Sequence, residues 1–398
     1  MSEGSLLVLG ASRYQLEVIQ KAKDLGYRVV TTDNVPGNPG HTVADRSFVV
    51  DTTALDEVLE IARRERVIGV VAPCTDVAVP TAAHVSDALG LCGIPFQSAR
   101  SLTSKLLFRE GLARLGLPVP RFQPLSAGVS VDQLPGPAAF PMIIKPEGSS
   151  GSKGIFIVRS REEVLERLPQ TMAFSPFAQA ILEQLIEGRQ GTCEGVVLDG
   201  EIVFSLMTDR ETAAPPFVAT AGHFVPSMMA PAERERTLAQ IATVLAAHEI
   251  RSTPFDCDFV VSADGVPYLL ELTPRLGGNS LTRLVRESTG IDLAEVAVRL
   301  ACRSPVSLSH AAAARPTAQL ILGVPASGRL AMDEAEAIAL RAEVWVRDLS
   351  FDYPVGHPVD AFINGRNRVG EATLVAESRA ELDVRAAELR ARLRLTST

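Results

Sequence analysis

Strand and helix signals alternate through the first hundred residues, and this alternation limits the fold more than any other feature of the sequence. Short apolar runs typical of buried strands lie at 5–10, 27–33, 46–51 and 67–73. Stretches with helical spacing lie at 15–26, 54–66 and 76–90. Strands that alternate with helices form a parallel, doubly wound sheet. The sequence therefore predicts a Rossmann-like α/β domain over residues 1–100, with any site at the carboxyl ends of its strands, around Gly10, Asp33 and 73–76.

The remainder of the chain predicts antiparallel sheets with helices. Two apolar runs flank the dipeptide Asp199-Gly200, and another two flank Asp264-Gly265. An Asp-Gly pair between such runs is a strong signal for a hairpin. From residue 309 onward, a helix at 335–344, a final arginine-rich helix and three strands predict a small α+β domain. The three strands are expected near 344–348, 360–364 and 370–378.

Charge and cysteine content exclude several functional classes. The formal net charge of −8 argues against a nucleic-acid or anionic-membrane partner, because both require a basic face. No apolar run approaches the roughly 18 residues that span a bilayer, and the N-terminus indicates a first strand rather than a signal peptide. The five cysteines are far apart, which favours reduced thiols over disulfides or a zinc site. We expect a cytoplasmic protein.

Residues 145–154, KPEGSSGSKG, contain two of the five lysines of the chain. A Walker A loop is excluded, because Ser152 rather than glycine precedes Lys153 and an apolar strand follows instead of a helix. A Gly/Ser loop between two strands can instead close over phosphates, offering backbone N–H groups and hydroxyls beside the fixed charge of Lys145. The alternative is a plain hairpin with a flexible tip.

The second Asp-Gly hairpin predicts a magnesium site. Counting back from its turn places Asp258 and Glu271 opposite each other on neighbouring strands. Magnesium is typically held by one or two carboxylates together with substrate phosphates, so this pair suffices, and Asp256 is a further candidate ligand. Arg275, four residues after Glu271, is placed to stabilise a transferring phosphate. The alternative is a solvated strand face.

Two further elements are weak when taken alone. Lys105 begins a predicted helix, where most lysines are ordinary surface residues. The apolar strand near 180–186 carries Glu183, and its backbone could meet the edge of an adenine ring.

Together, in this order and spacing, these segments resemble the ATP-grasp superfamily over about residues 5–305. The carriers of the resemblance are SKLLFREGLARLGLPVP, IIKPEGSSGSKGI, LEQLIEG and DFVVSADGVPYLLELTPRLGG. The resemblance implies a central ATP-grasp domain over 101–308, with a small lid lobe at 120–185 and a large lobe at 186–308, before a C-terminal domain at 309–398. It implies ATP and Mg²⁺ as cofactors, with Mn²⁺ as an alternative. The implied nucleotide-binding residues are Lys105, Lys145, Ser149, Ser150, Ser152, Glu183, Gln184 and Ile186.

This sequence departs from the family pattern at two positions. The family usually has Glu-x-Asn at its metal, whereas Thr273 follows Glu271 here, so threonine is expected to act as a weaker or water-mediated ligand. The ribose-binding acid seven residues after the hinge glutamate is Gln190, whose amide still forms hydrogen bonds with hydroxyls. Glu194 lies nearby and is a candidate for ribose, substrate or metal.

The resemblance implies a carboxylate–amine ligase that acts through an acyl phosphate and joins amino-acid-like small molecules. Arg275 and Lys153, the latter on a moving lid, would neutralise developing charge. Arg210 is predicted to bind a substrate carboxylate and His223 to assist the amine, with Arg283 and Arg286 as further carboxylate-binding candidates. A homodimer is expected because dimers are common in the superfamily.

Three alternatives remain open at this point. The first is a bicarbonate-activating carboxylase or carbamoyl-type enzyme of the same superfamily. The second is a nicotinamide-dependent oxidoreductase, disfavoured because Ser12 and Gln15 occupy later glycine positions of the required motif. The third is a non-catalytic ATP-binding module, suggested by Gln190 and Thr273.

Overall fold

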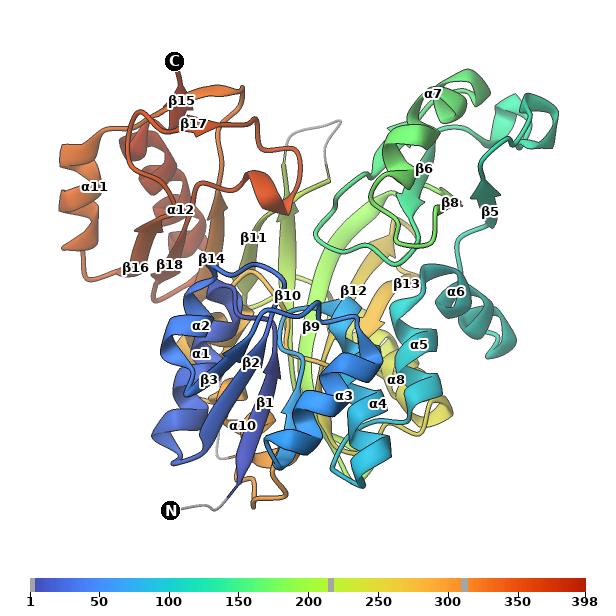
Figure 1. Ribbon diagram of the computed structural model, residues 1–398. Helices are drawn as coiled ribbons and strands as arrows, with labels where there is room; N and C mark the ends of the chain where they lie inside the picture. The colour runs from blue at the N-terminus through green and yellow to red at the C-terminus, as the bar shows by residue number, and fades with distance from the viewer. Residues whose placement is uncertain (1–3, 214–217, 309–313) are drawn as a thin grey trace.

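The computed structural model describes residues 4–213, 218–308 and 314–398, arranged as a base with two upper lobes (Figure 1). The first part of the base is a four-stranded sheet in the order β3-β2-β1-β4, with every pair parallel. Its strands are β1 (Ser5–Leu9), β2 (Arg28–Thr32), β3 (Arg46–Phe48) and β4 (Val67–Val71). The predicted parallel sheet is therefore confirmed.

The two faces of this sheet bury alternate residues of β1, as the two-residue period of a strand requires. Leu6 and Val8 pack in a cluster with α1 (Arg13–Asp24) and α10 (Leu293–Ala301). Leu7 and Leu9 pack on the other face with α3 (Leu55–Arg64) and α4 (Val79–Leu89). The remaining elements of this region are α2 (Pro39–Val43), η1 (Asp76–Ala78), α5 (Phe96–Thr103) and α6 (Lys105–Arg114).

One upper lobe, on the right in Figure 1, is a four-stranded antiparallel sheet in the order β5-β8-β6-β7. The strands are β5 (Phe122–Ser126), β6 (Met142–Pro146), β7 (Phe156–Val158) and β8 (Gln179–Gln184). Helix α7 (Arg161–Met172) packs on it, and two short 3₁₀ turns are η2 (Val131–Gln133) and η3 (Pro137–Ala139). The predicted strand-loop-strand unit is thus present, with the loop 147–155 between β6 and β7.

An eight-stranded sheet runs through the rest of the molecule in the order β13-β12-β9-β10-β11-β14-β18-β16. Its central strands are β9 (Gly188–Leu198), β10 (Glu201–Thr212), β11 (Thr220–Val225), β12 (Thr253–Ser262) and β13 (Pro267–Thr273). The C-terminal strands are β14 (Thr317–Leu322), β16 (Val346–Phe351) and β18 (Gly370–Val375). The pairing of β11 with β14 carries the sheet across the domain boundary expected at 308/309, beside residues 309–313 that lie outside the described part.

Both predicted Asp-Gly hairpins are present. Leu198 pairs with Glu201, so Asp199 and Gly200 form a two-residue turn in which both residues have positive φ. Such turns match the right-handed twist of the flanking strands, which explains the Asp-Gly pair. Strands β12 and β13 form the second hairpin.

Helices α8 (Pro231–Ala247) and α9 (Leu281–Thr289) flank the large sheet, and the C-terminal part adds α11 (Glu334–Arg341) and α12 (Arg379–Leu393). A small sheet of β15 (Gly328–Ala331), β17 (Pro358–Val359) and β19 (Thr396–Ser397) completes the left upper lobe. The strand predicted at 360–364 is wrong. Only Ala361 makes an isolated bridge there, because the Asn364 side chain accepts from the backbone N–H of Arg366 and begins the 3₁₀ turn η4 (Gly365–Asn367).

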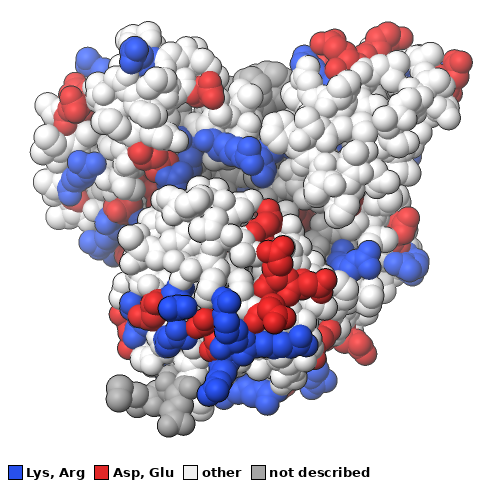
Figure 2. All heavy atoms as spheres, viewed as in Figure 1, with Lys and Arg blue, Asp and Glu red and all other residues white. Residues whose placement is uncertain are grey.

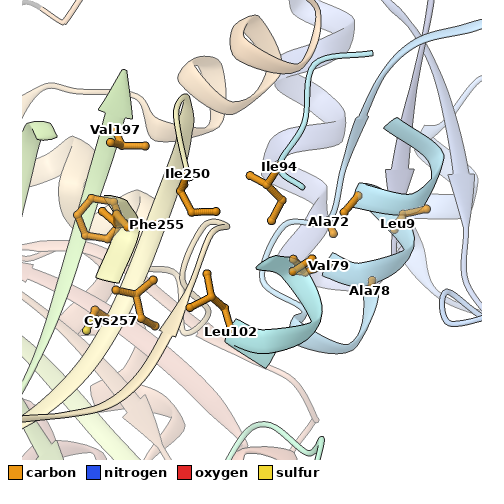
Figure 3. Packing of buried hydrophobic residues seen from close by; sticks show 14 of the residues in the cluster. Leu9, Ala72, Ala78, Val79, Ile94, Leu102, Val197, Ile250, Phe255 and Cys257 are labelled. Carbon is orange, nitrogen blue, oxygen red and sulfur yellow. The ribbon is translucent and has the colours of Figure 1, made fainter. Parts of the chain in front are cut away.

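The N-terminal sheet and the large sheet share one hydrophobic core. Ala72, Val79 and Ile94 face Ile250 and Phe255 across the junction (Figure 3). Shared apolar burial of this kind resists relative movement of the two parts. Within the described ranges, no helix combines the length and apolar character needed to cross a membrane.

Candidate active site

A cavity of about 370 Å³ lies where the N-terminal sheet, the right upper lobe, the large sheet and the C-terminal part meet. Figure 2 shows a hollow between the two upper lobes, with Lys or Arg atoms at its rim. Fifteen residues proposed from the sequence line this cavity, although they come from segments up to 170 residues apart. They are Lys105, Lys145, Ser149, Ser150, Ser152, Lys153, Glu183, Gln184, Ile186, Gln190, Arg210, Asp256, Asp258, Glu271 and Arg275.

A buried ionic network fixes the position of Lys145. The Lys145 Nζ donates to Glu183 Oε2 at 2.5 Å, and Arg109 Nε donates to Glu183 Oε1 at 2.7 Å. Burial opposes the ionisation of Glu183, but Arg109 and Lys145 together lower its pKa to about 2. Burial, with Arg109 nearby, lowers the pKa of Lys145. The network holds one carboxylate between two cations.

Arg109 is a residue that sequence reasoning missed. It is fully buried on α6, and its neighbours Phe108 and Leu112 are also buried. A charged residue on the apolar face of a helix requires a partner, because an unpaired buried charge is costly. The position of Arg109 among apolar helix residues could therefore have indicated, from the sequence alone, that it needs a buried acidic partner.

The lid loop 147–155 is held down at three points. Lys105 Nζ donates to the carbonyl of Ser149 at 2.6 Å, and Ser152 Oγ donates to the carbonyl of Val218 at 3.4 Å. The backbone N–H of Gly365, in the C-terminal part, donates to the carbonyl of Gly151 at 3.0 Å. The loop therefore closes the cavity against both the N-terminal and the C-terminal halves of the chain.

The lid loop also packs closely against Phe174, and a glycine makes this contact possible. At Gly154, where φ is +67°, a Cβ atom would come 2.7 Å from the Phe174 ring. The positive φ and the contact both exclude an ordinary side chain.

Three cations face the cavity without a carboxylate partner. Lys105, Lys153 and Arg366 line it, and none forms an ion pair with any Asp or Glu in the described part of the chain. Burial, followed by the charge of Arg366, lowers the pKa of Lys153. Cations that repel one another in a partly buried space are stabilised by an anion between them. Arg366 was not foreseen, because its position depends on how the C-terminal part packs.

Acidic residues also line the cavity, on the wall formed by β12 and β13. Asp258 on β12 and Glu271 on β13 are directly paired in register, which confirms the count back from the turn. Burial, together with the Asp76 carboxylate, raises the pKa of Glu271 to about 7. A carboxyl group with a raised pKa beside other acids is stabilised as the carboxylate by a cation.

Two arginines partly neutralise this wall. Arg275 Nε donates to Asp76 Oδ1 at 2.8 Å, and its Nη1 contacts Asp256. Arg210 Nη1 donates to Asp258 Oδ2 at 2.9 Å. Both guanidinium groups therefore have acidic partners, whereas Lys105, Lys153 and Arg366 do not.

The structure tests whether these acids fit a divalent ion. No cluster of three or more His, Cys, Asp or Glu side chains suited to a metal occurs among the described residues. Two carboxylates are nevertheless the usual protein contribution for Mg²⁺, which takes its other ligands from water and phosphate. Asp258 and Glu271 meet that requirement at the cavity wall.

Five residues predicted from the sequence do not line this cavity. Arg283 and Arg286 lie outside it, where they form ion pairs with Asp348 and Glu17. His223 is buried behind the wall, where its Nδ1 lies 3.1 Å from Thr208 Oγ1, and burial lowers its pKa to about 3. Glu194 and Thr273 are also buried, on the two strands that flank β12 at Asp256. These three side chains do not line the cavity, so direct roles for them are not supported.

Glu194 instead lies under the glycine-rich loop that follows β13. Its Oε2 accepts from the backbone N–H of Gly277 at 3.3 Å. A Cβ at Gly277 would come 1.9 Å from Glu194 Oε1. The carboxyl group therefore occupies the space that a side chain at Gly277 would need.

Part of the chain that lines this cavity matches a known protein family. Residues 138–283 match the family model described as the ATP-grasp domain. The match covers 146 of the 398 residues, so it identifies an ATP-grasp domain in this central segment of the chain. Several named proteins are also similar to this chain in sequence or in structure.

The L-amino acid ligase from Bacillus licheniformis is similar in fold, with a TM-score of 0.82 and 20% identity over 99% of this chain and 98% of that one. The phosphoribosylglycinamide synthetase from Anaerococcus prevotii has a TM-score of 0.76 and 20% identity over 99% and 100%. The formate-dependent phosphoribosylglycinamide formyltransferase from Burkholderia pseudomallei (strain 668) is 34% identical over 168 residues. That match spans 40% of each chain, and thus less than half the length of this curated relative.

Proposed function

We propose that this protein is an ATP-dependent carboxylate–amine ligase. A substrate carboxylate oxygen attacks the γ-phosphorus of ATP, which gives an acyl phosphate and releases ADP. An amine nitrogen then attacks the acyl carbon, inorganic phosphate leaves, and the nitrogen loses a proton as the amide forms. The protein contribution to such a reaction is mainly positioning and electrostatic stabilisation.

The observation that carries this proposal is the set of unpaired cations. Lys105, Lys153 and Arg366 come from three separate parts of the chain and face one cavity. A triphosphate would supply the missing negative charge, and Lys145 would add a fixed cation at the end of β6. Bringing a carboxylate next to a triphosphate requires this excess of positive charge, because the two anions otherwise repel each other.

Asp258 and Glu271 would hold Mg²⁺, or Mn²⁺ in its place. When bound, the ion would neutralise phosphate charge at the acidic wall. The raised pKa of Glu271 supports this role, since the nearby acids need a positive charge.

The hinge after β8 is the proposed adenine site. Glu183 is held by Arg109 and Lys145, so its carboxylate is already occupied. The cavity edge is formed by Gln184 and Ile186, whose backbone groups would meet the adenine, and Gln190 would bind the ribose hydroxyls.

A coupled ADP-release screen over amino acids, dipeptides and bicarbonate tests the proposal. We expect ADP release to depend on Mg²⁺ and on an amino-acid-like carboxylate together with an amine, and to disappear in Lys145→Ala and Glu271→Ala. Lys23→Ala and Glu377→Ala, which alter side chains outside the cavity, are the matched controls. Release with bicarbonate alone would favour the carboxylase alternative, and no release with any substrate would favour a binding module. A cytoplasmic location and a homodimer remain predictions.

A further inference from the structure

One acidic residue of the N-terminal part of the chain reaches the 370 Å³ cavity. Asp76 begins the 3₁₀ turn η1, in the segment that follows β4, and lines the cavity together with Arg275. The chain is fixed on both sides of Asp76, because Ala72 and Ala78 are buried in the core shared by the two sheets (Figure 3). Asp76 therefore connects the N-terminal sheet to the segment that follows β13.

Two further contacts hold the segment of Asp76 against the segment of Arg275. The backbone N–H of Cys74 donates to the carbonyl of Leu276 at 3.1 Å. The thiol of Cys74 donates to the carbonyl of Gly277 at 3.0 Å. Both contacts lie next to the ion pair of Asp76 with Arg275, so the two charged side chains meet between backbone segments that are already joined.

Asp76 holds the guanidinium of Arg275 through two of its nitrogens. Nε donates to Asp76 Oδ1 at 2.8 Å, and Nη2 contacts the same oxygen. Nη1 contacts Asp256 Oδ2 and donates to the carbonyl of Leu276 at 3.1 Å. Within the described part of the chain, only Nη2 therefore keeps an N–H group without an acceptor. Because the guanidinium is planar, its contact through Nε and Nη2 fixes both its plane and the direction of that N–H group.

The charges of this pair are firmly established. Burial opposes the ionisation of Asp76, but Arg275 keeps its pKa below the ordinary value. Burial also opposes the charge of Arg275, but Asp76 and Asp256 raise its pKa. Asp256 contacts only Nη1, so it does not set the direction of Nη2. Asp76 is thus the residue that orients the cavity-facing donor.

We propose that Asp76 is a positioning residue that acts through Arg275 and directs its remaining Nη2 N–H group toward the phosphoryl group that ATP transfers. This inference rests on the proposed function, which places ATP in the cavity. A donor stabilises developing charge only if it is already aimed at the place where that charge forms. Misplacement of such a group costs much of the rate, so the N-terminal sheet contributes to phosphoryl transfer without contacting the substrate.

The test compares kcat with nucleotide binding in the full chain. Asp76→Asn keeps the size of the side chain and one oxygen acceptor but removes the charge that holds the guanidinium. With a substrate pair that supports ADP release, we expect kcat at saturating ATP and Mg²⁺ to fall at least about tenfold. The affinity for a non-hydrolysable ATP analogue should change by less than about threefold, because the lost interaction belongs to the transition state.

Asp56→Asn, at an exposed position of α3 in the same part of the chain, is the matched control, and circular dichroism verifies folding. A folded Asp76→Asn variant with an unchanged or higher kcat would overturn the proposal. A loss that disappears when the Mg²⁺ concentration is raised would also overturn it, because that result would assign Asp76 to the metal site.

A double-mutant cycle shows whether Asp76 acts through Arg275. Arg275→Lys keeps the positive charge but lacks the planar fork that Asp76 holds. Asp76→Asn should therefore lower kcat by less than about threefold in the Arg275→Lys background. Independent effects that multiply in the double variant would contradict a positioning role.

A measurement without turnover separates this inference from the ligase proposal. Calorimetry compares the binding of Mg²⁺ and ADP with and without aluminium fluoride, which mimics the transferring phosphoryl group. We expect the gain in affinity from aluminium fluoride to be at least about tenfold smaller in Asp76→Asn than in the parent protein. An equal gain in both proteins, or no gain in either, would overturn the inference.

The ligase proposal and this inference fail in different ways. If no carboxylate and amine support ADP release but Asp76→Asn loses the gain from aluminium fluoride, the ligase function fails and the role of Asp76 stands. If ADP release requires an amino acid and an amine but Asp76→Asn retains the parent kcat, the ligase function stands and the role of Asp76 fails.

Discussion

Asp258 and Glu271 are direct partners across the β12–β13 hairpin, so two carboxylates from strands of opposite direction meet at one cavity wall. Their separation along the chain is set by the turn, and their common face is set by the register. A shift of one residue in either strand would turn one of the two carboxylates away from the cavity.

This pairing predicts a specific metal dependence. Glu271→Gln keeps the size of the side chain and removes its charge, so the proposed Mg²⁺ site would lose one of its two protein ligands. We expect the Mg²⁺ concentration for half-maximal ADP release to rise by about tenfold or more. A titration of ADP release against Mg²⁺ measures the shift, with Glu377→Gln as the control at an exposed position. An unchanged Mg²⁺ requirement would remove Glu271 from the metal site.

The Lys145–Glu183–Arg109 network predicts a pH-dependent stability. The pKa of Glu183 is about 2 in the folded protein, against the ordinary value of 4.5. Its ion pairs therefore stabilise the fold above about pH 4.5, and this contribution is lost as the pH falls toward 2. Glu183→Gln should be less stable at neutral pH by about 3 kcal/mol and should lose less stability on acidification.

Denaturant unfolding at several pH values measures this effect. Glu166→Gln, at an exposed position of α7, should retain both the stability and the acid sensitivity of the parent protein. Parallel pH profiles for the parent and Glu183→Gln would show that Glu183 does not carry the effect.

Arg366 predicts that the C-terminal part contributes to nucleotide binding. Removing one of three unpaired cations should weaken the binding of a triphosphate by roughly tenfold in Arg366→Gln, and the binding of adenosine should change little. Calorimetry with a non-hydrolysable ATP analogue and with adenosine separates these two outcomes. Arg347→Gln, a C-terminal arginine outside the cavity, is the control. An equal loss of affinity for the ATP analogue and for adenosine would indicate general disruption of the site.

Gly277 predicts a steric coupling to Glu194. Gly277→Ala places a methyl group where the Glu194 carboxyl lies, and overpacking of this kind costs about 1–3 kcal/mol. Gly278→Ala should be tolerated, because nothing lies within 4 Å of a Cβ there. The free energy of unfolding of the pair Gly277→Ala and Glu194→Ala, compared with each single variant, measures the coupling. Strict additivity would mean that the two residues do not compete for space.

Much of the fold could be predicted from local patterns. The alternation in the first hundred residues predicted the parallel sheet, and the Asp-Gly pairs predicted both hairpins. The strand expected at 360–364 was wrong because the capping by Asn364 outweighed the apolar residues around it. The continuity of the large sheet through β14 depends on long-range pairing, which no local pattern contains.

The site was predictable where its residues lie on regular elements. Asp258 and Glu271 follow from strand period and turn position, whereas His223 on β11 and Glu194 on β9 are buried and do not line the cavity. Arg366 reaches the cavity through tertiary packing, so sequence reasoning could not assign it a role, whereas Asp76 lies in the segment 73–76 where the sequence already placed a site. Arg109 could have been found, since a charged residue on an apolar helix face needs a partner.

The hydrogen bond between Gly365 and Gly151 has a consequence for how the cavity opens. It ties the tip of the lid to a segment more than two hundred residues farther along the chain. The lid can lift only after that bond, the Lys105 contact with Ser149 and the Ser152 contact with Val218 have all broken. The lid is therefore connected to the right upper lobe through β6 and β7 and is held at its tip by the C-terminal lobe. A substitution in the C-terminal lobe that contacts no ligand would alter the rate at which ligands enter and leave the cavity.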